Sequence, residues 1–108
     1  MKTGDVILIP FPFADFKTTK VRPAVVITET ADRYKDLVIS AISSVVPDSL
    51  NKNEILVNPS KTNNLRVQSV IKVDRIVTLK QEEMIANLGK LSSYELLNFI
   101  RIFADLIK

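Results

Sequence analysis

The chain has 108 residues, a formal net charge of +3 and 46% hydrophobic residues, which is the size and composition of one globular domain and too short for two. It contains no Cys, which excludes disulfides, thiolate metal sites and a cysteine nucleophile. It also contains no His, which excludes the commonest metal ligand and every histidine-based catalytic triad. We therefore expect a single domain over residues 1–108 that is stabilised by packing and in which any catalysis is histidine-free.

The first expected strand is a compact apolar run over Asp5–Pro10. Prolines at positions 10 and 12 interrupt the apolar stretch, which is too short for a signal peptide or a membrane span. The sequence therefore predicts a cytoplasmic protein that makes no contact with a membrane.

Further runs of β-branched residues, bounded by turn formers, predict strands along the next part of the chain. They cover Ala24–Thr28, Leu37–Ile42, Glu54–Val57, Ser69–Val73 and, beyond a bend, Arg75–Leu79. A short strand is expected over Ile85–Leu88, with Gly89 marking a turn after it. The adjacent acids Glu82 and Glu83 are typical of the start of a helix or turn, and we assign them no catalytic role. This many short strands predict a small β-barrel or a strongly twisted sheet.

The last part of the chain changes to helical periodicity. From Ser92 to Lys108, apolar residues recur at spacings of three and four, which predicts an amphipathic helix. They are Leu96, Phe99, Ile100, Phe103, Leu106 and Ile107. Ser92, with Glu95 three residues later, fits a capping box and marks the start of this helix.

Positive charge is concentrated in two polar stretches, Asp15–Arg22 and Lys61–Lys80. The first holds three bases and one acid, namely Lys17, Lys20 and Arg22 with Asp15. The second holds five bases and one acid, namely Lys61, Arg66, Lys72, Arg75 and Lys80 with Asp74. If the two stretches are neighbours in the fold, they form a basic groove suited to an anionic partner; if not, they are solvated loops.

Five blocks of the sequence stand in a characteristic order. An N-terminal block is followed by an Arg-Pro dipeptide that enters a strand, and three further blocks come after it. The blocks are Gly4-Asp5-Val6 with Phe11-Pro12-Phe13, then Val21–Ile27, Leu37–Ser44, Ser69–Leu79 and Leu88–Ser92. In this order and at this spacing they resemble the PemK/MazF family of toxin endoribonucleases. Together they cover essentially the whole chain, and in combination they are a specific signal.

The resemblance implies a mainly β fold with a C-terminal α-helix, namely a small SH3-like β-barrel, and a homodimer. It implies metal-independent, sequence-selective cleavage of single-stranded RNA, with 2′,3′-cyclic phosphate and 5′-hydroxyl ends as products. It also implies that the protein is the toxin of a type II toxin-antitoxin module with a cognate acidic antitoxin as its partner.

The family's catalytic pair is the arginine of the Arg-Pro dipeptide and a threonine that ends the third strand. By position these residues are Arg22 and Ser43, so serine replaces the usual threonine. A guanidinium offers a planar fork of donors that matches two phosphate oxygens, which suits Arg22 to this role. Serine keeps the hydroxyl but loses the β-branch that restricts χ1 of threonine.

The loop between the first two strands is a candidate basic flap over the RNA, although an exposed polar loop with no such role is the alternative. Its candidate RNA-binding residues are Lys17, Thr18, Thr19 and Lys20. Lysines in such a flap would contact phosphates and make RNA binding depend on salt.

Two further residues are candidates for RNA contact. Ser44 adjoins Ser43, so the register at the strand end is open between the two serines. Arg75 stands where the family commonly has a glutamine, and Asp74 beside it is placed to orient Arg75 or Arg22 through a salt bridge.

Two other functions stay open at this point. One is a non-enzymatic poison of DNA gyrase, as in the CcdB relatives of the same fold. Those relatives use a C-terminal tail that contains tryptophan, whereas this chain ends in Ala104–Lys108 and contains no Trp. The other is a catalytically silent barrel that binds RNA or a protein, which the serine at position 43 leaves open.

Overall fold

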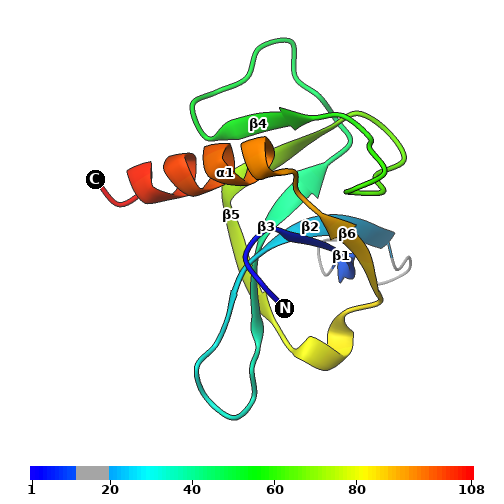
Figure 1. Ribbon diagram of the computed structural model, residues 1–108, viewed down its shortest axis with the longest axis vertical. Coiled ribbons are helices and arrows are strands. Elements are labelled where there is room, and N and C mark those ends of the chain that lie inside the picture. The colour runs from blue at the N-terminus through cyan, green and yellow to red at the C-terminus, as the bar shows by residue number, and fades with distance from the viewer. Residues whose placement is uncertain (12–19) are drawn as a thin grey trace.

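The computed structural model of the protein describes residues 1–11 and 20–108. This part of the chain folds into six strands, a short 3₁₀ helix and one C-terminal α-helix (Figure 1). In chain order they are β1 (Asp5–Phe11), β2 (Lys20–Glu29), β3 (Leu37–Ser43), β4 (Glu54–Val57), β5 (Ser69–Leu79), η1 (Gln81–Glu83), β6 (Ala86–Lys90) and α1 (Ser93–Asp105). The prediction of a mainly β fold with a C-terminal helix is confirmed.

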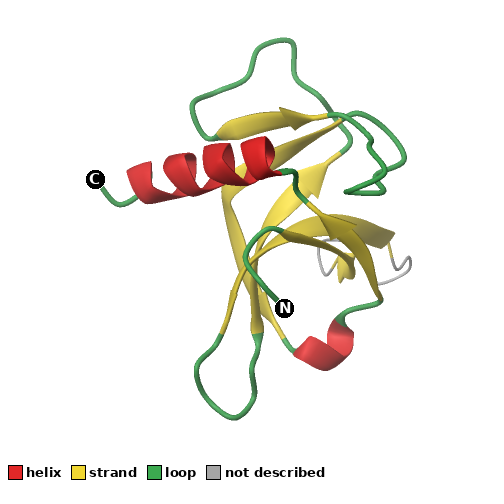
Figure 2. Ribbon diagram, in the orientation of Figure 1, coloured by secondary structure: helices red, strands yellow, loops and turns green. Residues whose placement is uncertain are grey.

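The strands form one antiparallel sheet in the order β4-β5-β3-β2-β1-β6. Figure 2 shows that the sheet curls strongly, as a half-barrel, with the helix lying across one end of it. The helix α1 packs against β4 and β5. The curl follows from the right-handed twist of the strands and from interruptions in their pairing.

Two hydrophobic clusters fill opposite faces of the curled sheet. One lies beneath α1 and includes Val25 and Phe99. The other includes Ala24, Val26 and Ile39. Because neighbouring residues of a strand point to opposite faces, β2 contributes alternately to the two clusters. The central strands of the sheet are thus buried on both faces.

The strand β5 runs through the predicted bend without ending, but its pairing with β3 is interrupted there. Ser40 of β3 faces Ile76, whereas the next residue, Ala41, faces Lys72. Residues 73–75 therefore have no opposite residue in β3 and form a bulge. Bulges bend a strand and re-aim its side chains.

Hydrogen bonds from two directions hold this bulge. The hydroxyl of Ser40, which is fully buried, donates to the carbonyl oxygen of Val73 at 2.9 Å. The N–H of Val73 donates to the carbonyl oxygen of Asn53 at 3.0 Å. Both backbone groups of Val73 are thereby satisfied although this residue has left the β3 ladder.

The connection between β4 and β5 closes the sheet against β6. The N–H of Lys90 donates to the carbonyl oxygen of Thr62 at 3.0 Å, and the side-chain amide of Asn64 donates to the carbonyl oxygen of Leu88. Gly89 lies inside β6, so the prediction that it marks a turn is wrong. A Cβ at this position would overlap the carbonyl oxygen of Thr62, so the close approach of two backbones requires the glycine.

The helix α1 begins where the sequence predicts. The hydroxyl of Ser92 accepts from the N–H of Glu95 at 3.2 Å, and the Glu95 carboxylate accepts from the N–H of Ser92 at 2.8 Å. This is the predicted capping box. The helix ends at Asp105, before the predicted end at Lys108, and the two adjacent glutamates lie in η1. Along the described residues, no helix has the length and hydropathy that crossing a membrane requires.

Candidate active site

The start of β2 and the end of β3 diverge, and the candidate site lies where they separate. Their ladder pairs Ala24 with Ala41 and, within the described residues of β2, includes none before Ala24. The preceding residue, Pro23, has no N–H to donate to a neighbouring strand. Arg22 and Ser43 each lie two residues beyond this last pair, so they occupy corresponding positions of the two strands without being paired in the ladder. Both side chains therefore belong to one face of the sheet, at neighbouring strand ends.

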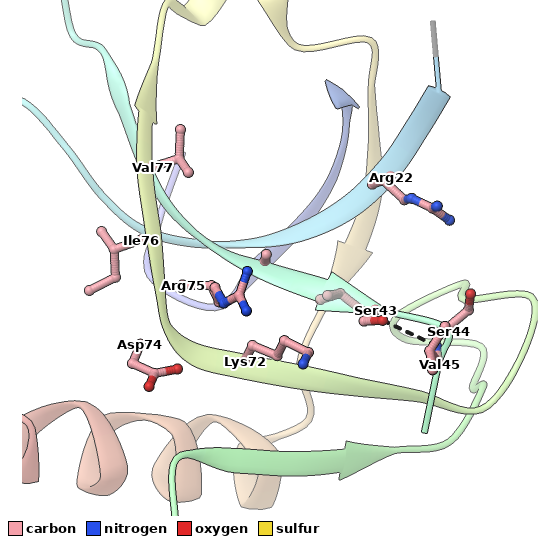
Figure 3. Close-up of a pocket in the computed structure, with 11 residues that line it drawn as sticks. Arg22, Ser43, Ser44, Val45, Lys72, Asp74, Arg75, Ile76 and Val77 are labelled. Carbon is pink, nitrogen blue, oxygen red and sulfur yellow. Dashed lines mark hydrogen bonds between the residues drawn. The ribbon is translucent and has the colours of Figure 1, made fainter. Parts of the chain in front are cut away.

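A hollow of about 480 Å³ lies beside these strand ends and is called the first hollow below (Figure 3). Its walls come from β2, from β3 and the residues after it, and from the bulged part of β5. The described lining residues are Arg22, Ala41, Ile42, Ser43, Ser44, Val45, Lys72, Asp74, Arg75, Ile76 and Val77. Its volume is in the range of ligand-binding clefts.

The hydroxyl of Ser43 is held in place by its own strand end. Its Oγ accepts a hydrogen bond from the N–H of Val45 at 3.1 Å, drawn as a dashed line in Figure 3. The oxygen is thus fixed at the wall of the first hollow, and the hydroxyl can still donate its proton to a ligand. Ser43 is half-buried, whereas Ser44 is exposed.

Positive charge dominates the first hollow. Three of its lining residues are cationic, Arg22, Lys72 and Arg75, and one is acidic, Asp74. Figure 3 shows Lys72 and Arg75 extending from β5. The Nζ of Lys72 lies 3.5 Å from a carboxylate oxygen of Glu54, its cross-strand neighbour in β4, which offsets part of its charge.

The predicted salt bridge of Asp74 with Arg75 or Arg22 is wrong. Within the described residues Asp74 forms no ion pair, and its Oδ2 accepts a hydrogen bond from Nδ2 of Asn53 at 3.2 Å. The bulge is the physical reason, because it brings Asp74 to the residue that also binds the bulge backbone. Arg75 is therefore not neutralised by the acid beside it in sequence.

A second hollow of about 520 Å³ adjoins the first, and Arg22 and Ser44 line both. Its other described lining residues are Leu8, Val21, Pro23, Asn64, Leu65, Arg66, Val67, Ser69 and Leu88. They include one further cation, Arg66, and the described lining contains no acid. Among the described residues, the linings of the two hollows together present Arg22, Arg66, Lys72 and Arg75 beside a single carboxylate, that of Asp74.

Four of the predicted site residues come together at the first hollow, namely Arg22, Ser43, Ser44 and Arg75. Lys20 is exposed at the start of β2 and is not among the described residues that line either hollow. The predicted contacts Lys17, Thr18 and Thr19 lie outside the described residues. The arginine at the end of the first basic stretch thus meets cations of the second stretch, which favours the basic-groove alternative over isolated loops.

Sequence reasoning did not assign Lys72 or Arg66 to the site. Their membership of the second basic stretch was the available signal, but it did not indicate which of five cations face the hollows. The bulge and the closure against β6 decide that, and neither is visible in the residue pattern. In the described part of the chain, no group of three or more metal-ligating side chains lies together.

Comparison with solved structures shows the same fold in several other proteins. The structure of an endoribonuclease in complex with its cognate antitoxin from Mycobacterial species has a TM-score of 0.75 at 15% identity, covering 99% of this chain and 94% of that one. The Mycobacterium tuberculosis toxin MazF-mt6 has a TM-score of 0.73 at 15% identity, covering 95% of each chain. MazF from Deinococcus radiodurans has a TM-score of 0.72 at 18% identity, covering 99% of this chain and 96% of that one.

Sequence comparison gives the family directly. No curated protein matches the chain at a significant level. The family model for PemK-like, MazF-like toxins of type II toxin-antitoxin systems matches residues 2–105, which is nearly the whole chain. This protein therefore belongs to the PemK-like, MazF-like family of toxins of type II toxin-antitoxin systems.

Proposed function

We propose that this protein, as a single domain over residues 1–108, is a metal-independent, sequence-selective endoribonuclease that cleaves single-stranded RNA as the toxin of a type II toxin-antitoxin module. The observation that carries the proposal is that Arg22 and Ser43, at the ends of two strands, line the same hollow together with further cations. The family match supports the reaction class, because toxins of this family are generally endoribonucleases.

The proposed reaction uses the RNA as its own nucleophile. The 2′-oxygen bonds to the adjacent phosphorus and the bond from phosphorus to the 5′-oxygen breaks, which leaves a 2′,3′-cyclic phosphate and a 5′-hydroxyl. The proton of the 2′-hydroxyl passes to water, and the departing 5′-oxygen takes a proton from water. Neither transfer requires a histidine, which the chain lacks.

Arg22 stabilises the phosphorane in this scheme. Negative charge grows on the two non-bridging oxygens as the 2′-oxygen attacks, and a guanidinium fork matches their spacing. One preorganised donor of this kind typically lowers the barrier by about 3 kcal/mol. Arg22 is half-buried on a strand, which favours a fixed position over that of a mobile surface side chain.

Ser43 positions the phosphate in this scheme. Its oxygen is anchored by the N–H of Val45, so the hydroxyl proton points from a fixed atom toward the ligand. The remaining cations, Lys72 and Arg75, bind neighbouring phosphates and add affinity that depends on salt.

The same charges suit an acidic antitoxin. An acidic segment lying along the two hollows would compete with RNA for four cationic side chains, and ordering on binding would let it follow the curved surface. One solved structure of similar fold is a complex of an endoribonuclease with its cognate antitoxin, which supports an antitoxin as the partner. We further propose a homodimer, as the family resemblance implies.

The test is cleavage of a long single-stranded RNA by purified protein in EDTA, with every new end mapped. We expect 5′-hydroxyl and 2′,3′-cyclic phosphate ends within a short recurring sequence. The matched controls are Arg22→Lys, which should lose cleavage, and Arg101→Lys on the exposed face of α1, which should keep it. RNA binding without any cleavage would contradict the proposal and favour a silent RNA-binding barrel.

A further inference from the structure

The second hollow lies across β2 from the first. Because side chains alternate along a strand, Val21 and Pro23 face away from the side on which Arg22 projects, and Leu8 is the cross-strand partner of Pro23. These three residues form one wall of the second hollow. Arg22 and Ser44 stand at the passage between the two hollows. A phosphate bound at Arg22 therefore has one flanking nucleotide beside the second hollow.

The walls of the second hollow suit a flat aromatic ligand. Most of its lining is aliphatic, and two of these side chains are largely uncovered, Val21 at 44% exposure and Val67 at 53%. Single-stranded RNA is recognised through unstacked bases whose edges are read by hydrogen bonds. An apolar wall can cover the flat face of such a base, as in other ligand pockets. A phosphate alone would gain nothing from the aliphatic wall.

The polar groups of the second hollow differ in how far they are already engaged. The hydroxyl of Ser69 donates to the carbonyl oxygen of Val67, and the amide of Asn64 donates to that of Leu88. Arg66, in contrast, is exposed and forms no hydrogen bond or ion pair with any described residue. Its guanidinium is the charged group of this hollow that is available to read a base.

A guanidinium fork fits a base edge that carries two adjacent acceptors. Guanine offers O6 and N7 side by side, whereas adenine places an amino donor beside N7. The described lining contains no carboxylate that would accept from this amino group. We propose that the second hollow is the subsite for the nucleobase beside the cleaved phosphate, that it prefers guanine, and that Arg66 determines this preference. The inference rests on the proposed RNA cleavage.

The test compares base preference in the parent protein, Arg66→Gln, Arg66→Lys and Arg75→Gln. Ends mapped on a long RNA should show guanine at one of the two positions that flank the cut, favoured about tenfold or more over adenine. Both Arg66 variants should lose this preference, since a lysine side chain keeps the charge without the fork. Arg75→Gln also removes one charge, but it should weaken RNA binding without changing the preferred base.

A second measurement separates this inference from the cleavage proposal. Short RNAs with a single 2′-deoxy nucleotide at the mapped cut lack the attacking 2′-hydroxyl, so they can bind without being cleaved. If no cut is found, a set of RNAs is used in which each position in turn carries the 2′-deoxy nucleotide. An Arg66-dependent preference for guanine in their binding would support the subsite even if the protein cleaved nothing. Absence of any base preference, a preference for another base, or a guanine preference that survives both Arg66 variants would overturn it.

Folding and assembly are checked on the same samples. Arg66 and Arg75 are both exposed, so all variants should melt at the parental temperature. If Arg66→Gln altered the sedimentation of the protein and left base preference unchanged, the second hollow would be a contact between subunits and the inference would be wrong.

Discussion

Arg22 is best tested by a substitution that keeps its charge. Arg22→Lys retains the cation but loses the bidentate fork, so turnover should fall by about 100-fold or more while RNA affinity changes little. Single-turnover cleavage and the Kd for a non-cleavable RNA measure the two effects separately. Cleavage by Arg22→Lys at the parental rate would remove Arg22 from the reaction.

Ser43 and Ser44 are distinguished by a matched pair of alanine variants. Ser43→Ala should slow cleavage several-fold because it removes the anchored hydroxyl, and Ser43→Thr should match or exceed the parent because the β-branch restricts χ1. Ser44→Ala, at an exposed position, should have the smaller effect. Rates are compared at matched melting temperature, since Ser43 also holds the N–H of Val45. If Ser44→Ala lost cleavage while Ser43→Ala kept it, Ser44 and not Ser43 would be the residue that positions the phosphate.

At this scale the sequence predicts part of the site and misses the rest for a physical reason. Arg22 and Ser43 are assigned by matching the family pattern; both line the first hollow, and their catalytic role stays a prediction. Arg66 and Lys72 do not follow, because a run of cations says nothing about which side chains a bulge or a loop closure turns toward a hollow. The salt bridge expected of Asp74 fails for the same reason.

The hairpin between β2 and β3 is an element whose stability should depend on pH. Oδ1 of Asp32 accepts from the hydroxyl of Thr30 at 2.8 Å and from the N–H groups of Tyr34 and Lys35 at 3.1 and 3.3 Å. The Thr30 hydroxyl, then these N–H groups, lower the pKa of Asp32 below its ordinary value despite some opposing desolvation. The carboxylate therefore stabilises the fold above its unfolded-state pKa, and this contribution is lost as pH falls through the folded-state pKa.

Asp32→Asn should accordingly melt at a lower temperature than the parent at neutral pH, and the difference should shrink as the pH becomes acidic. Thermal unfolding of both proteins across that range measures it. Asp48→Asn, in the exposed connection after β3, serves as the control for loss of one carboxylate. If the difference in melting temperature between the parent and Asp32→Asn stayed constant down to strongly acidic pH, the Asp32 carboxylate would not be the group that makes stability depend on pH.

The closure of the sheet at β6 makes Gly89 a second test of an element. Gly89→Ala forces a Cβ onto the carbonyl oxygen of Thr62, and backbone cannot move aside as a flexible side chain can. We expect a loss of about 2 kcal/mol or more, seen as a drop in melting temperature of several degrees. Asn87→Ala, exposed in the same strand, should change the melting temperature little. If Gly89→Ala melted at the same temperature as the parent, the backbones at Gly89 and Thr62 would not approach closely enough to require glycine.

The elements themselves are largely predictable because β-branched runs and helical spacing report burial directly. The predicted and observed bounds of the strand Glu54–Val57 are identical, and the capping box marks the start of α1. The first residues of β2 are missed, since Lys20 and Arg22 are charged, Pro23 lacks an N–H, and the segment Lys20–Pro23 pairs with β1 but not with β3. Gly89 is missed because a glycine required by a distant backbone looks in sequence like a glycine required by a turn.

For the whole molecule, we expect a two-fold symmetric dimer, as the family resemblance implies. Its mass should be near twice 12.1 kDa at micromolar concentration. Analytical ultracentrifugation over a range of concentrations measures this, with Arg22→Lys as a control that alters the proposed chemistry and should leave the mass unchanged. A monomer across that range would contradict the proposed dimer.

The bulge in β5 has a consequence for how such proteins diverge. Asp74 and Arg75 face no residue of β3. The backbone of the preceding residue, Val73, is held by hydrogen bonds to Ser40 and Asn53. Replacing either exposed side chain therefore leaves the ladder and both hydrophobic clusters untouched. Substitutions at these positions can then change the chemistry of the hollow without disturbing the fold, which is one physical route to proteins of the same fold with a TM-score of 0.72 at only 18% identity.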